Sequence, residues 1–196
     1  MKKKLLVIIA IVCVAAFALS ACGGGSGSGG SSNAGGGAAE TYDVGAFTVS
    51  LPPGWTAFPQ DDIFGDKDAA GNYPVDPETI LLAKGAKDEF DAFSCPSVRI
   101  YWYNPDAYVI DSRSFYDNVE DISGVTISGT ECEAYSGESM GYTYQFIHFQ
   151  TETEQYDFNI LISVDGKDTG ITWEDPEVKT IIESVSMKTE SEEEIK

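Results

Sequence analysis

The sequence has a single histidine, His148, and few basic residues, with 12 Lys and Arg against 32 Asp and Glu. A serine-histidine-acid triad and most zinc sites need histidine placed beside other reactive groups, so this composition argues against both. The formal net charge of −20 repels nucleic acid and anionic lipid head groups, and we expect no nucleic-acid partner. Such a surface favours solubility, and it also attracts cations or a basic partner.

Long apolar runs are missing except at the start, which reads MKKKLLVIIAIVCVAAFALSAC. Three lysines precede an apolar run from Leu5 to Leu19. As a helix this run measures about 22 Å, which is shorter than the ~30 Å hydrocarbon core of a bilayer. The pattern therefore predicts an export signal that is removed, not a membrane span.

The end of this segment, Leu19-Ser20-Ala21-Cys22, resembles the lipobox of bacterial lipoproteins. The resemblance implies that residues 1–21 are a signal peptide and that Cys22 carries a diacylglycerol on its sulfur. Two acyl chains would hold the protein on the extracytoplasmic face of the cell membrane. The alternative is an ordinary signal peptide cut after Ala21, which would leave Cys22 as a free thiol.

Composition divides the rest of the chain into three parts. Residues 22–41 contain the lipidated cysteine and a stretch dominated by glycine and serine, which is typical of a flexible tether. Residues 42–188 are long enough for one domain with its own core. Residues 189–196, with the acidic run ESEEE, are interpreted as a solvated tail.

The domain shows alternating apolar residues in several short runs and helical spacing in two. Strands are predicted over 47–51, near Trp55, and over 80–83, 97–103, 125–132, 142–149 and 156–164. Helices are predicted over 112–122 and after an Asp175-Pro176 start. The expected fold class is α+β, a central antiparallel sheet of about six strands flanked by helices in a single domain.

The opening FTVSLPPGWTAF (47–58) and the ending VKTIIESVSMK (178–188) resemble the PsbP-like α/β sandwich superfamily. Lipoproteins of that kind begin their domain with a strand followed by Pro-x-Gly-Trp. The resemblance implies a sheet flanked by helices and a non-enzymatic role in binding or assembling other proteins. It assigns no site residue here, because the matched positions are structural.

Cys95 and Cys132 are the two cysteines left in the exported domain. In an oxidising compartment they are predicted to pair, which would stabilise the fold by about 4 kcal/mol on a chain-entropy estimate. The alternative is two separate buried thiols. Two thiolates without nearby histidines make only half of a zinc site.

GESMG, residues 137–141, matches the Gly-x-Ser-x-Gly pattern of hydrolase nucleophiles. That motif needs a helix after the serine, whereas residues 142–149 alternate as a strand. His148 would also lie roughly 30 Å along that strand from Ser139. Ser139 is therefore interpreted as a residue of a tight turn between two strands.

The loop over residues 61–78 is rich in Asp, Gly and Pro. A calcium site there would draw on the oxygens of Asp66, Asp68, Asn72, Asp76 and Glu78. The match to an EF-hand is partial, because Glu78 falls one position late and no flanking helices are predicted. The plainer interpretation is a solvated, turn-rich loop without a metal.

Residues 99–103 place Arg99, Tyr101 and Tyr103 on one face of a strand. Exposed tyrosines in such a row can form a platform for carbohydrate or peptide; the alternative is that helices bury them. His148 shares a strand face with other aromatic residues. It is interpreted as a packed, hydrogen-bonded side chain, with a ligand or pH-sensing role as the alternative.

These features predict a non-catalytic binding or assembly factor whose partner is another surface or membrane protein. A calcium-dependent binding module is one alternative. The other is a hydrolase of cell-wall components, because two carboxylates suffice for glycoside hydrolysis.

Overall fold

The computed structural model describes residues 39–188 of the chain. The predicted signal peptide 1–21, the lipidation site Cys22, most of the tether and the acidic tail 189–196 lie outside the described residues. Among residues 39–188, no helix is both long and apolar enough to span a bilayer.

Short strands make up most of the domain. In chain order they are β1 Glu40–Asp43, β2 Phe47–Leu51, β3 Trp55–Asp61, β4 Val75–Lys84, β5 Ser97–Tyr103, β6 Asp117–Asp121, β7 Thr126–Ile127, β8 Thr130–Glu131, β9 Glu133–Ser139, β10 Tyr142–Gln150, β11 Gln155–Val164, β12 Lys167–Asp168 and β13 Ser186–Met187. The helical elements are the 3₁₀ turns η1 Asp91–Phe93 and η2 Arg113–Phe115, and the helix α1 Pro176–Glu183.

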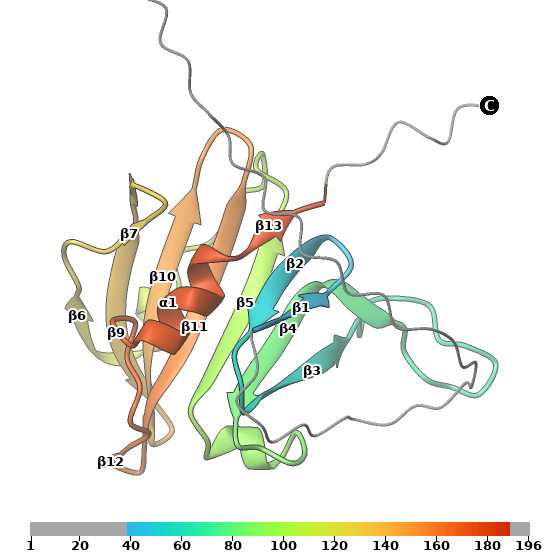
Figure 1. The fold of residues 1–196 in the computed structure, drawn as a ribbon, viewed down its shortest axis with the longest axis horizontal. Coiled ribbons are helices and arrows are strands. Elements are labelled where there is room, and N and C mark those ends of the chain that lie inside the picture. The colour runs from blue at the N-terminus through green and yellow to red at the C-terminus, as the bar shows by residue number, and fades with distance from the viewer. Residues whose placement is uncertain (1–38, 189–196) are drawn as a thin grey trace, which may run out of the picture. The chain divides into compact units, whose positions relative to one another are not determined.

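One large antiparallel sheet organises the molecule. Its eight strands include the path β3-β4-β5-β11-β10-β9-β6, and β12 adds to β11. A small sheet of order β1-β2-β13 and the helix α1 lie on the same face of the large sheet (Figure 1). We call this the covered face.

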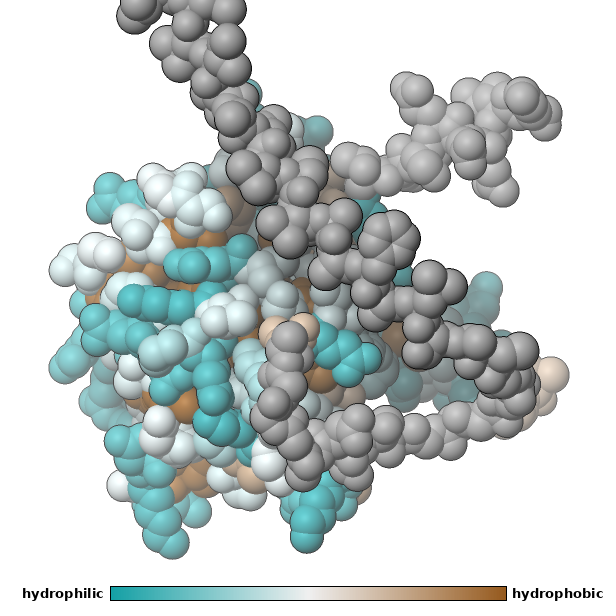
Figure 2. All heavy atoms as spheres, in the orientation of Figure 1, coloured by the Kyte–Doolittle hydropathy of each residue, from teal (hydrophilic) through white to brown (hydrophobic). Residues whose placement is uncertain are grey.

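The main core fills the space between the large sheet and its cover. Apolar residues that are almost fully buried come from both layers: Phe47, Val49, Ile80, Leu82, Val98, Ile100, Phe158, Ile160, Val178 and Ile181. Seen from this side, the outer surface of the molecule is mostly hydrophilic, and hydrophobic residues show in the gaps (Figure 2). Burial of these alternating strand residues against α1 and β2 is the main source of stability.

The closing helix was predicted correctly, including its start. The side chain of Asp175 accepts a hydrogen bond from the backbone N–H of Glu177 at 2.9 Å, and Pro176 occupies the first turn. Val178, Ile181 and Ile182 are buried on one side of α1. The cap satisfies a backbone donor that the helix itself leaves without a partner.

The predicted fold class is wrong in its balance of elements. The domain is β-rich, with an eight-stranded antiparallel sheet, and residues 39–188 contain one α-helix of eight residues. The α+β prediction and the PsbP-like resemblance both implied a sheet flanked by helices. In the structure, helices do not flank the sheet in this way. The physical reason is that β1, β2 and β13 supply much of the cover that we had assigned to helices.

The helix predicted over 112–122 does not form. Residues 113–115 make a single 3₁₀ turn, and the chain continues as the edge strand β6. Asn118 has a positive φ of 51°, which interrupts a right-handed helix. Phe115 and Val119, the supposed buried stripe, are 71% and 36% exposed.

The strand predicted over 125–132 is also wrong. Ser128 and Gly129 have positive φ values of 49° and 82°, which turn the chain back so that β7 pairs with β8. The strand that precedes β10 and pairs with it is β9, over residues 133–139, which we had not predicted. Its turn into β10 is formed by Met140 and Gly141, whereas Ser139, which we had interpreted as a turn residue, is the last residue of β9.

Candidate functional site

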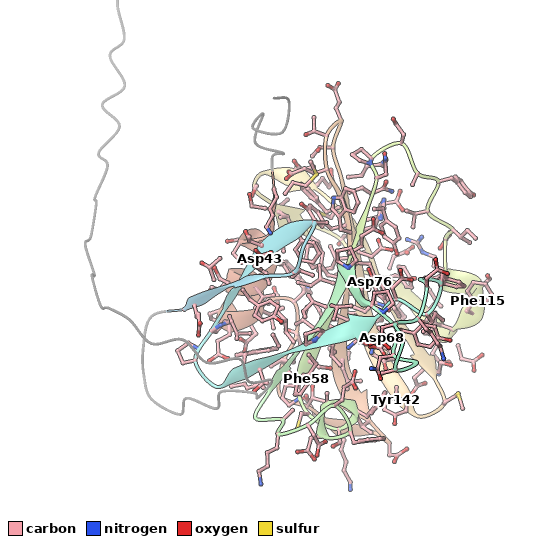
Figure 3. All side chains as sticks on the ribbon, turned by 90° about the vertical axis from the view of Figure 1, so that its right-hand side faces the viewer. Asp43, Phe58, Asp68, Asp76, Phe115 and Tyr142 are labelled. Atoms are coloured by element: carbon pink, nitrogen blue, oxygen red, sulfur yellow. The ribbon has the colours of Figure 1, made fainter. Side chains whose placement is uncertain are left out.

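The second face of the large sheet, opposite α1, has no sheet or α-helix over it among the described residues, and we call it the open face. Figure 3 shows Asp43 of β1 and Phe115 of the segment before β6 on opposite sides of the sheet. Side chains that alternate with the core residues point to the open face. Two adjoining cavities of about 700 and 180 Å³ lie here, and together we call them the groove.

Four neighbouring strands form the floor of the groove. The sheet register brings together Tyr101 of β5, Asp157 of β11, His148 of β10 and Glu133 of β9 in one row across the strands. Because adjacent strands are about 4.8 Å apart, such a row brings residues distant in sequence into contact.

His148 and Asp157 form a hydrogen-bonded pair at the centre of this floor. The Nδ1 atom of His148 lies 2.6 Å from the Oδ1 atom of Asp157, and the two side chains are 27% and 23% exposed. The hydrogen bond to this carboxylate raises the pKa of His148, and burial opposes the shift. The pair therefore favours the protonated imidazole, a state with two N–H donors.

Tyrosine rings supply most of the apolar surface of the groove. Tyr101 and Tyr103, the binding residues predicted from the sequence, both line the larger cavity, and their rings stack with centroids 6.4 Å apart. Burial and the nearby Asp157 carboxylate raise the pKa of Tyr103 well above its usual value. Its hydroxyl is therefore neutral, and it can both donate and accept hydrogen bonds.

An aromatic cluster separates the two cavities. The ring of Phe146 lies 4.6 Å from that of Tyr116 and 4.7 Å from that of Tyr135, measured between centroids. Gly137 of β9 makes room for this cluster, because a Cβ there would come within 2.8 Å of the Cβ of Tyr116. The first glycine of GESMG thus lets Tyr116 lie against the sheet.

One wall of the larger cavity is the segment 107–116, which we call the wall segment. Arg113 attaches it to the sheet through ion pairs with Asp121 at 3.5 Å and Glu133 at 3.9 Å. Its guanidinium also lies 4.5 Å from the centre of the Tyr135 ring. The hydroxyl oxygens of Ser112 and Tyr135 are 2.6 Å apart, which adds a hydrogen bond. These contacts hold the wall segment against the sheet without an α-helix.

The smaller cavity lies beside β5 and contains Arg99, Tyr144 and Asn159. Burial raises the pKa of Tyr144, and the Arg99 guanidinium acts in the opposite direction. The Nη1 atom of Arg99 is 3.5 Å from the hydroxyl oxygen of Tyr101, at the outer limit of a hydrogen bond.

The acidic loop uses its side chains to hold its own turns. Asp68 accepts hydrogen bonds from the backbone N–H groups of Ala70 and Asn72 and from the Asn72 side chain. Asp76 accepts one from the backbone N–H of Glu78. Burial, Asp76 and Asp62 raise the pKa of Glu78.

No cluster of three or more His, Cys, Asp or Glu side chains suited to a metal ion occurs within residues 39–188. Asp66, Asp68, Asp76 and Glu78 therefore form no such cluster, and calcium binding by them and Asn72 stays a prediction.

Cys95 and Cys132 are both free thiols in the structure, so the predicted disulfide is not formed. Cys95 packs against the small cluster around Leu81 on the open face, whereas Cys132 belongs to the main core on the covered face. The sheet thus stands between the two thiols.

Ser139 ends β9, paired with Tyr142, and is not among the residues that line the groove. The sequence analysis did not identify Asp157, Asn159, Tyr116 or Tyr135 as groove residues. The alternation of polar and apolar residues in 155–164 was the available signal for Asp157 and Asn159. Their neighbours depend on strand register, which the sequence alone does not define.

No family model matches the chain, and no curated protein is similar to it in sequence. Among solved structures, a Bacteroides thetaiotaomicron VPI-5482 protein determined at 1.50 Å resolution is similar in part, with a TM-score of 0.44 and 12% sequence identity. The alignment covers 79% of this chain and 50% of the other, so this chain spans about half the length of that one. Nothing about the function of this protein follows from so distant a likeness.

Proposed function

We propose that this protein is a non-catalytic binding factor, held on the extracytoplasmic face of the membrane by a lipid on Cys22, and that its groove takes the ligand. The observation that carries the proposal is the cavity of about 700 Å³ on the open face of the sheet, where Tyr101 and Tyr103 stack beside the His148–Asp157 pair. Its volume is within the usual range for small-ligand sites.

The lining combines ring surfaces with groups that orient a ligand. Tyrosines provide large contact area at low cost in conformational entropy, because each has few rotatable bonds. Polar side chains on β10 and β11 add donors and acceptors at fixed positions. Residues on a sheet are held more precisely than residues on loops.

A binding experiment with the full chain tests the proposal. Soluble cell-wall glycans and short peptides would be titrated by calorimetry against the natural chain and the variants Tyr101→Ala and Tyr103→Ala. Loss of one stacking ring should weaken binding about tenfold. Tyr73→Ala is the matched control, because Tyr73 lies in the acidic loop and contacts Lys67 instead of the groove. Equal affinity in all four proteins would contradict the proposal.

Lipid attachment has its own test. Cells that express the chain would be labelled with radioactive palmitate, and we expect label in the natural chain and none in Cys22→Ser. Label that persists in the variant would contradict the anchor.

A glycan hydrolase is the second candidate, on one specific observation. Glu133 and Asp157 lie on either side of His148 in the sheet register, two strand spacings or about 9.5 Å apart at the backbone. Inverting glycosidases separate their carboxyl groups by roughly 6.5 to 9.5 Å. Asp157 is bound to His148, however, and Glu133 is 75% exposed beside Arg113.

If the natural chain hydrolyses wall fragments and each of Glu133→Gln and Asp157→Asn abolishes this activity, the protein is an enzyme. That result would refute the proposal that the protein only binds its ligand. Absence of product with the natural chain would eliminate this candidate.

A further inference from the structure

The smaller cavity of the groove lacks acidic residues, in a protein where acids are abundant. None of its lining residues is Asp or Glu, and Arg99 is the charged residue among them. The whole chain carries 32 acidic and 12 basic residues. A pocket without carboxylates is therefore a local exception to the charge of the protein, and it is the part of the groove least repulsive to an anion.

Arg99 has no carboxylate partner among the described residues. The ion pairs within 39–188 involve Lys84, Arg113, His148 and Lys188, and Arg99 is absent from them. The side chain is partly buried and makes one long hydrogen bond, to the hydroxyl of Tyr101. A guanidinium has five N–H donors in a planar fork, so most of its capacity is unused.

Neutral donors line the same cavity as this guanidinium. Tyr101, Tyr116 and Tyr144 line the same cavity, together with the carboxamide of Asn159 and the hydroxyl of Ser97. Phenol, amide and guanidinium donors that converge on one small space are suited to the two oxygens of a carboxylate. Hydrogen bonds that involve a charged partner are about twice as strong as neutral ones.

The larger cavity favours a ligand with many hydroxyl groups. Gln155, only 2% exposed, lines this cavity, and its side-chain oxygen has no hydrogen-bond partner. Hydroxyl groups suit the polar side chains that line this cavity, among them His148, Asp157 and Asn159, because each hydroxyl both donates and accepts. The tyrosine rings offer flat surfaces of the size of a sugar ring.

The position of the groove argues against an extended peptide. Peptides that bind sheets usually pair with an edge strand through their backbone. The edges of the large sheet are β3 and β6, whereas the floor of the groove is formed by the inner strands β5, β11, β10 and β9. Those inner strands already pair on both sides.

We propose that the groove binds an acidic carbohydrate, with a sugar carboxylate seated against Arg99 in the smaller cavity and the adjoining rings on Tyr101 and Tyr103. This inference rests on the proposed function, since it assigns the class of ligand to the same groove.

The test uses two probes with the same sugar chain, one with charged carboxylates and one with neutral methyl esters. Trigalacturonic acid and its methyl ester would be titrated by calorimetry against the full chain and against Arg99→Gln, Arg99→Lys and Lys167→Gln. Lys167 is exposed in β12 and does not line either cavity, so its variant matches the charge change of Arg99→Gln. A tripeptide with a free carboxyl terminus and its amide form a second pair.

We expect the acid to bind about ten- to hundredfold more tightly than the ester, the range for a charge-assisted pair. Arg99→Gln should abolish this preference and leave the weak binding of the ester unchanged. Arg99→Lys should restore part of it, because a lysine keeps the charge but not the fork. Lys167→Gln should behave as the natural chain.

Three results would overturn the inference. In the first, the acid and the ester bind equally well, and Tyr101→Ala weakens this binding but Arg99→Gln does not. This result would refute the role of Arg99 as the carboxylate site and leave the groove as a binding site. Arg99-dependent binding of the tripeptide without binding of trigalacturonic acid would assign the groove to a peptide carboxylate. Binding of neither sugar probe would refute the carbohydrate, and the wider panel of glycans and peptides would then decide the binding function.

Discussion

The two faces of the large sheet are made by the same strands but differ in burial: one is covered by α1 and the small sheet, and the other forms the groove. On the covered face, Phe158 and Ile160 of β11 pack under α1 and β2 and are at most 1% exposed. On the open face, Asp157 and Asn159 of the same strand line the groove. The comparison teaches that strand alternation separates core residues from groove residues one residue at a time.

The cover explains the difference. Residues under α1 and the small sheet exclude water and contribute through the apolar area they bury. The wall segment on the other face touches the sheet mainly through Arg113, Ser112 and Tyr116, so the groove stays open between them. The open face carries stacked rings and paired charges, the groups to which we assign ligand binding in our proposal.

Adjacent residues of β11 give the sharpest comparison of the two faces. Phe158→Ala should lower the free energy of unfolding by about 3–5 kcal/mol, because it opens a cavity in a closed core. Asn159→Ala, one residue along, should cost less than about 1 kcal/mol, because its side chain faces the groove. Urea denaturation of both variants measures this. Similar losses would mean that the groove face is part of the core.

The His148–Asp157 pair should make stability depend on pH. The folded-state pKa of His148 is raised above its usual value, so its contribution is fully present below about pH 6.5 and is lost as the pH rises through the folded value. Asp157→Asn should therefore cost about 1–2 kcal/mol at pH 5.5 and clearly less at pH 9.

Unfolding of both proteins across this pH range checks the expectation. Glu152→Gln removes one negative charge from an exposed turn and serves as the control, with no such pH dependence. A difference between the natural chain and Asp157→Asn that does not vary with pH would contradict the pairing.

The cap of α1 tests the cover of the core alone. Asp175→Ala should lower stability by about 1 kcal/mol, because the backbone N–H of Glu177 loses its acceptor. Thermal unfolding measures the loss. Ligand affinity of the groove should not change, and a large drop in affinity would show that the two faces are coupled.

The smallest effect is expected from reduction of the thiols. Cys95 and Cys132 lie on opposite faces of the sheet as free thiols, so dithiothreitol should leave the melting temperature unchanged. A disulfide, as predicted from the sequence, would contribute about 4 kcal/mol and its reduction would lower the melting temperature by many degrees. That outcome would restore the sequence-based prediction.

Much of the sheet was predictable because alternation is a local property. The strands around Phe47, Tyr101, Phe146 and Phe158 and the capped helix after Asp175 were all anticipated. The helix over 112–122 was predicted wrongly because its apolar spacing also suits a 3₁₀ turn followed by an edge strand. Asn118, which can adopt a left-handed conformation, was the residue that should have weakened that prediction.

The groove was predictable only in part. Tyr101 and Tyr103 were identified because they share one face of a single strand. His148 was seen as a lone histidine, since its partner Asp157 comes from the next strand and meets it through the register of β10 with β11. The gathering of Arg99 with Tyr116 and Tyr144 likewise combines three segments far apart in the sequence, and no local pattern reveals it.

The most direct test of the central claim, that the open face is the ligand site, follows the ring protons of the single histidine by nuclear magnetic resonance in the untagged chain. His148 lines the groove, so its signals are an unambiguous reporter during titration with the panel of glycans and peptides. We predict that a ligand shifts these signals in the natural chain and does so only at much higher concentration in Tyr101→Ala. Saturable binding that leaves the His148 signals unmoved would contradict the account and move the site away from the open face.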